Sequence, residues 1–124
     1  MPGPHLPPAL EAFVSLFNKG AYWESHEALE AEWRRTRSAF YHGLILYASA
    51  WVHQERKNQH GILAQLDKAD PLLQDHAPGY LGIDVAGILR DAQNLRAGQP
   101  RAGPSILTDL RLLSGQEPEL ERTD

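Results

Sequence analysis

Apolar residues recur along this chain at intervals of three and four, which is the spacing that places side chains on one face of an α-helix. No stretch shows the strict alternation of apolar and polar residues that is typical of a strand. The pattern therefore predicts an all-α fold: a compact bundle of about five helices with a central apolar helix and an extended C-terminal tail. The expected helices are residues 8–19, 22–36, 39–57, a segment from the break at 58–61 to about 74, and 85–96.

The third of these helices is apolar around most of its circumference, so we expect it to be the buried centre of the bundle. Its polar residues fall within about 60° of one another on a helical wheel. This strip either contacts solvent or faces the second helix, which a short connection makes an antiparallel neighbour. The strip consists of His42, Ser49, His53 and Arg56. The residues expected in the core are Leu29, Trp33, Ile45, Ala48 and Trp51.

The apolar spacing that is typical of a helix ends at about residue 98. Residues 76–82 are expected to form a loop, and Asp84 is placed to cap the fifth helix. Residues 106–113 fit either a short helix or an extended arm, and periodicity does not choose between them. We expect residues 1–113 to form a single domain and residues 114–124 to be a disordered polar tail.

The second predicted helix carries an imidazole and a carboxylate on an otherwise apolar face. His26 and Glu30 are four residues apart, and Trp33 follows at about 20° from Tyr22 on the wheel, with His26 near 40°. Ionisable groups that point toward a core must be paired, hydrogen-bonded or bound to something. This helix is therefore the first place to look for chemistry.

The same residues resemble a bacterial and archaeal family known as domain of unknown function 309. Its signature, H-x-x-x-E-x-x-W/Y, is met by His26, Glu30 and Trp33, within a longer similar stretch that begins at Phe17. A second similar block runs from Phe40 through Ile45 and continues to His53, Asn58 and Gly61, with His42 where the family usually has Gln. The resemblance extends over roughly residues 9–97. It implies an all-helical fold and a suspected metal site, and it supplies no established activity.

One hypothesis is a divalent metal ion held by His26, Glu30 and His53. Imidazole nitrogen and carboxylate oxygen are ordinary ligands for such ions, and His53 lies on the polar strip of the neighbouring helix. His42 shares that strip but lies about 16 Å from His53 along the axis, so both cannot bind one ion. In a metal-dependent hydrolase the ion would lower the pKa of a bound water, and Glu27 is the candidate general base. The sequence names no substrate or small-molecule ligand.

The alternative hypothesis is a non-enzymatic interaction or scaffold module. His26 and Glu30 would then be a hydrogen-bonded structural pair, and the apolar face with its tryptophans would build a homodimer. Both hypotheses stay open at the level of the sequence, and so does the question of whether the protein is an enzyme.

Composition and motifs argue against several classes of function and location. Twelve basic against sixteen acidic residues give a net charge of −4, which argues against nucleic-acid binding. The N-terminus has no signal-peptide pattern, and the apolar run from residue 39 to 52 is too short to cross a bilayer, so we expect no membrane association. The chain has no cysteine, which agrees with the cytoplasm. Glycine-rich phosphate loops and serine-hydrolase elbows are absent from the sequence.

Overall fold

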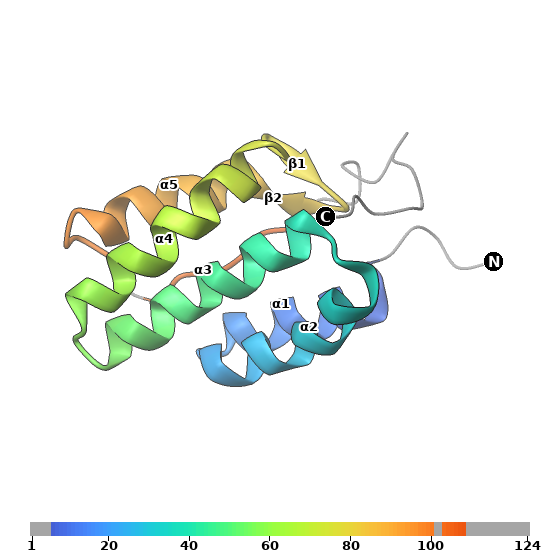
Figure 1. Ribbon diagram of the computed structural model, residues 1–124, viewed down its shortest axis with the longest axis horizontal. Coiled ribbons are helices and arrows are strands. Elements are labelled where there is room, and N and C mark those ends of the chain that lie inside the picture. Colours follow the sequence, from blue (N-terminus) through green and yellow to red (C-terminus); the bar gives the residue numbers. More distant parts are fainter. Residues whose placement is uncertain (1–5, 101–102, 109–124) are drawn as a thin grey trace.

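The computed structural model describes residues 6–100 and 103–108, and in that part of the chain the fold is all-α, as predicted (Figure 1). Five helices follow one another, with a short antiparallel strand pair before the last. The helices are α1 (Pro8–Asn18), α2 (Tyr22–Thr36), α3 (Ala39–Glu55), α4 (Gln59–Gln74) and α5 (Val85–Arg96), and the strands are β1 (Gly79–Tyr80) and β2 (Ile83–Asp84).

Helix α3 is the centre of the bundle. It packs against α2 on one side and against α4 on the other, while α1 packs on α2 and α5 on α4 (Figure 1). Ten of its residues are buried, which is more than in any other described helix. The prediction of a central apolar helix is therefore confirmed.

Helices α3, α4 and α5 begin where a side chain accepts a free backbone N–H of the first turn. Ser38 Oγ accepts from the N–H of Tyr41 at the start of α3, and Asp84 accepts from Gly87 at the start of α5. The same device starts α4 two or three residues earlier than expected, because Asn58 caps it. Residue Arg37 ends α2 in the left-handed conformation, with φ of 57°, and lets the chain turn back into α3.

Aromatic rings fill the core between α1, α2 and α3. The Phe17 ring lies 5.5 Å from that of Tyr47 and 4.9 Å from that of Tyr22, and Tyr22 lies 5.8 Å from Trp51. Four of the five residues expected in the core are buried: Leu29, Ile45, Ala48 and Trp51.

The prediction of a buried Trp33 was wrong. Its side chain is only partly buried and packs against the edge of the core. The reason is its place in the last turn of α2, just before the chain turns at Arg37 toward α3. Trp33 thus lies at the edge of the core, although apolar spacing alone predicted it to be in the interior.

The segment after α5 returns as an extended arm, which decides between helix and arm for residues 106–108. The side-chain oxygen of Asn18 accepts a hydrogen bond from the N–H of Ile106 at 2.7 Å. The side-chain NH2 of Asn18 donates to the carbonyl of Ile106 at 3.1 Å. Asp84 N–H donates to the carbonyl of Leu107 at 2.9 Å, and Thr108 forms a bridge with Ile83. Residues 109–113 and the predicted tail, 114–124, lie outside the described residues.

None of the helices in the described ranges is both long enough and apolar enough to cross a membrane.

Candidate functional site

The outer side of α2 carries a connected row of side chains. The His26 ring stacks on the indole of Trp23, with centroids 5.0 Å apart and planes inclined by 15°. His26 Nε2 lies 3.9 Å from Glu30 Oε2, and Glu30 Oε1 lies 3.1 Å from Arg34 Nη2. The predicted pair on one helix face is therefore present, and it extends in both directions to residues that the sequence analysis did not single out.

This row is only partly withdrawn from solvent. The side chains of His26 and Glu30 are 18% and 32% exposed, and Trp23 is 50% exposed. His26 Nδ1 is buried and has no hydrogen-bond partner among the described residues. At 3.9 Å the contact between His26 and Glu30 is too long for a hydrogen bond, so Arg34 is the closer partner of this carboxylate.

His53 takes part in the turn between α3 and α4. Its Nδ1 accepts a hydrogen bond from the side-chain amide of Asn58 at 3.2 Å. The carbonyl oxygen of the same amide accepts from Gly61 N–H at 3.1 Å, and Asn58 N–H donates to the His53 carbonyl at 2.9 Å. Three residues of the second family-like block thus form one capping unit, which gives His53 a structural role.

The three predicted metal ligands do not form a cluster. In residues 6–100 and 103–108, no group of three or more His, Asp or Glu side chains is arranged to hold a metal ion. Two of the predicted ligands have other partners here: His53 accepts a hydrogen bond from Asn58 within its own turn, and Glu30 is paired with Arg34. Glu27, the candidate general base, is exposed on α2. Metal binding by His26, Glu30 and His53 and a catalytic role for Glu27 both stay predictions.

His42 is the residue of the polar strip that meets α2. Its ring stacks on Trp33, with centroids 4.4 Å apart and planes inclined by 22°. Arg37 lies against the same indole, with its Cζ 5.1 Å from the ring centroid. Burial lowers the pKa of His42, and the positive charges of Lys68 and Arg37 lower it further. The apolar spacing of the sequence did not predict that the partly buried imidazole of His42 would be affected by two positive charges.

The chain was compared with models of known protein families and with curated proteins. Residues 10–64 match the model of the family described as domain of unknown function DUF309. The match confirms the resemblance over α1, α2, α3 and the first turns of α4, and it includes all three signature residues, His26, Glu30 and Trp33. It is shorter than the roughly 9–97 expected from the sequence, and α5 and the arm lie beyond it. A search of curated proteins found no match.

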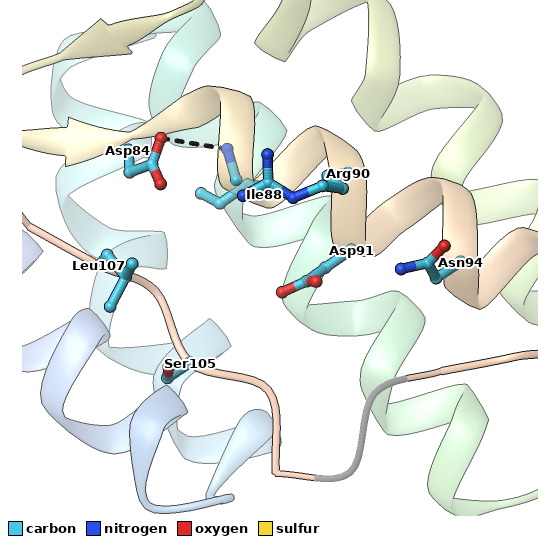
Figure 2. A pocket seen from close by; sticks show the side chains of 8 residues that line it. Asp84, Ile88, Arg90, Asp91, Asn94, Ser105 and Leu107 are labelled. Atoms are coloured by element: carbon cyan, nitrogen blue, oxygen red, sulfur yellow. Dashed lines mark hydrogen bonds between the residues drawn. The ribbon is translucent and has the colours of Figure 1, made fainter.

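A polar pocket lies outside the DUF309 match, between α5 and the arm (Figure 2). Asp91 and Asn94 project from α5, and Ser105 and Leu107 line the pocket from the arm. Asp84 stands at one end, where it caps α5 through Gly87 N–H. Two of its lining residues, Asp84 and Leu107, are also joined by a backbone hydrogen bond that attaches the arm.

Proposed function

We propose that this DUF309-like protein is a non-enzymatic binding module that forms a homodimer through the outer face of α2. The observation that carries the proposal is Trp23, whose indole is half exposed and held flat against His26. A tryptophan whose ring is already fixed by stacking loses little conformational freedom when a partner covers it. Tryptophan is also among the residues that contribute most to the affinity of protein interfaces.

The charges of α2 support a second copy as the partner. Glu24 and Glu27 are exposed in its first half, and Arg34 and Arg35 are exposed in its last turn. Two copies of α2 packed antiparallel about a two-fold axis would bring Glu24 and Glu27 of each beside Arg34 and Arg35 of the other, which within one chain pair with Glu30 and Glu32. Such a face is self-complementary, as a two-fold interface requires.

The signature residues then have a structural purpose at this face. His26 supports the indole of Trp23, and Glu30 holds Arg34 in place through a 3.1 Å ion pair. The metal-dependent hydrolase is the weaker hypothesis, because the described residues offer no group of three ligands for the ion. We place the module in the cytoplasm, in agreement with a chain that has no cysteine.

Sedimentation equilibrium of the full chain tests the proposal. We expect a dimer at about 100 μM, and we expect Trp23→Ala to weaken dimerisation about tenfold or more, as the loss of an interface anchor does. Leu107→Ala is the matched control, because among the described residues Leu107 is the other large apolar side chain that is strongly exposed, at 60%, and it lies on the arm. A monomeric wild-type protein at this concentration, or an equal effect of both variants, contradicts the proposal.

Charge reversal tests the antiparallel arrangement separately. Glu27→Arg and Arg34→Glu should each weaken self-association, because each places like charges opposite one another. An equimolar mixture of the two variants should recover dimers, since both cross-pairs are then of opposite sign. Failure of the mixture to associate would rule out this pairing of the two helices.

A further inference from the structure

The polar pocket between α5 and the arm has the size and the chemistry of a site for a small molecule (Figure 2). Its volume is about 180 Å³, which is below the roughly 300–1,000 Å³ of pockets that take drug-sized ligands. We propose that it binds a free α-amino acid with a polar side chain of about the length of glutamine. The pocket is independent of the proposed dimer, because α5 packs on α4, on the other side of α3 from α2.

Arg90 supplies the positive charge of the pocket. It is exposed, and within the part of the chain that the structure describes its guanidinium forms no ion pair or hydrogen bond. Arg90 Nη2 lies 3.5 Å from the point where a Cβ of Gly87 would be, so the side chain runs back along α5 toward Asp84 (Figure 2). A guanidinium that can offer two parallel N–H groups is suited to bind the carboxylate of a ligand.

Asp84 supplies a negative charge next to this guanidinium. Its Oδ1 accepts a hydrogen bond from Gly87 N–H and so caps α5. Its Oδ2 lies so close to Gly87 that a Cβ there would overlap it. Oδ2 and the guanidinium of Arg90 therefore lie beside the same glycine, yet Asp84 and Arg90 form no ion pair with each other. A ligand that carries both charges on neighbouring atoms can pair with each of them.

A free α-amino acid is the class of molecule that matches this arrangement. Its carboxylate and its ammonium group are attached to one carbon, so the carboxylate can accept from Arg90 while the ammonium group donates to Asp84 Oδ2. The N-terminus of a peptide has the ammonium group without that carboxylate, and the C-terminus has the carboxylate without that ammonium group. The two neighbouring charges therefore favour a free amino acid over a peptide end.

The side chain of the ligand would extend along α5 toward Asn94. Gly87, Asp91 and Asn94 share one face of the helix, and the distance from Gly87 to Asn94 is about 10 Å along the axis. Asn94 and, from the arm, Ser105 offer an amide and a hydroxyl that can each donate and accept, which suits a neutral polar group at the end of a long side chain. Asp91 is buried and engaged in an interaction of its own, so the proposed ligand does not depend on it.

An NMR titration of the full-length protein with L-glutamine tests the proposal. We expect a dissociation constant of about 1 mM or lower, with shifts of the backbone amides of Gly87, Arg90 and Ser105. N-acetyl-L-glutamine and L-glutamine amide each lack one of the two charges, and each should bind at least about tenfold more weakly. L-norleucine, whose side chain has a similar length but an apolar end, should also bind more weakly.

Two kinds of result would overturn the proposal. One is the absence of shifts at these amides at about 10 mM L-glutamine, a concentration at which a 1 mM site is mostly occupied. The other is binding of any of the three analogues as tight as that of L-glutamine, because the two charges or the polar end of the side chain would then not be recognised.

Two variants and a matched control assign binding to this pocket. Arg90→Gln and Asp84→Asn should each weaken L-glutamine binding about tenfold or more, since each removes one of the two charges. Asp84→Asn keeps a side-chain oxygen for Gly87 N–H, so α5 remains capped. Arg56→Gln is the control, because Arg56 is also exposed and makes no ion pair with another described residue, but it follows α3. Equal effects of Arg90→Gln and Arg56→Gln, or unchanged binding in Asp84→Asn, would contradict the site.

Discussion

At the scale of single residues, Gly61 shows how the turn between α3 and α4 constrains its neighbours. A Cβ at this position would overlap the ring of His53, whose Cγ would be 2.7 Å away, and would also crowd the side-chain amide of Asn58, at 2.8 Å. The glycine, the imidazole and the amide therefore fit together as one unit. His53 belongs to this unit through its hydrogen bond to Asn58, and the block that resembles the family here is explained by packing and capping.

We predict that Gly61→Ala lowers the free energy of unfolding by about 1–3 kcal/mol, the usual cost of forcing an extra methyl into a packed site. In a His53→Ala background the same substitution should cost less, because the ring that blocks the methyl is gone. Urea denaturation of the wild type, both single variants and the double variant gives the coupling energy. Additive losses would show that Gly61 and His53 are not packed as described.

His42 gives a second prediction at this scale, in the pH dependence of stability. Its pKa is lowered in the folded protein, so between the usual value of 6.5 and the lower folded value the unfolded chain binds a proton that the folded chain does not. The contribution of neutral His42 to the free energy of unfolding is therefore fully present above pH 6.5. It is lost as the pH falls toward the pKa of His42 in the folded protein.

His42→Gln should remove this part of the pH dependence. Glutamine carries no titratable group, so the difference in unfolding free energy between pH 7 and pH 5 should be smaller in the variant than in the wild type. The measurement is denaturant unfolding at a series of pH values in chloride buffers, without sulfate or phosphate. An unchanged slope would place the acid sensitivity of the protein in other residues.

At the scale of elements, the C-terminal arm is attached by a single side chain of α1. Asn18 presents its amide to the backbone of Ile106 and makes the two hydrogen bonds that a neighbouring strand would otherwise make. The arm also pairs with the backbone of β2, residues 83 and 84, just before α5. One polar side chain thus connects the first helix of the chain to its last described segment.

Asn18→Ala should destabilise the protein by about 1–2 kcal/mol, because it removes two partly buried hydrogen bonds. Asn18→Asp is the matched comparison: it can still accept from Ile106 N–H but has no group to donate to the carbonyl. Hydrogen exchange at Ile106 should become faster in the alanine variant. An arm that stays protected in Asn18→Ala would mean that the contacts at residues 83 and 84 hold it alone.

At the scale of the whole molecule, the three expected metal ligands have different partners. His26 stacks on Trp23, Glu30 is paired with Arg34, and His53 is bonded to Asn58. We predict that protein purified without a His-tag contains no stoichiometric divalent metal, and that a chelator leaves the unfolding midpoint unchanged. His26→Ala should instead cost about 1–2 kcal/mol, through lost packing against Trp23. Stoichiometric metal that disappears in His26→Ala would revive the metal-site hypothesis.

The sequence by itself determined the features that depend on near neighbours in the chain. Apolar spacing located five helices, and Asp84 marked the start of the last of them, because capping and helical periodicity act within a few residues. The family signature likewise pointed to α2, where His26 and Glu30 do share a face.

Only the tertiary structure decided which distant groups meet. The spacing rules could not show that His53 bonds to Asn58, that His42 stacks on Trp33, or that the charge of Lys68 on α4 acts on His42. The wheel also assigned Trp33 to the interior, although a helix end at the edge of the bundle leaves it partly exposed. Such contacts depend on the rotation and offset of packed helices, which the pattern of a single helix does not contain.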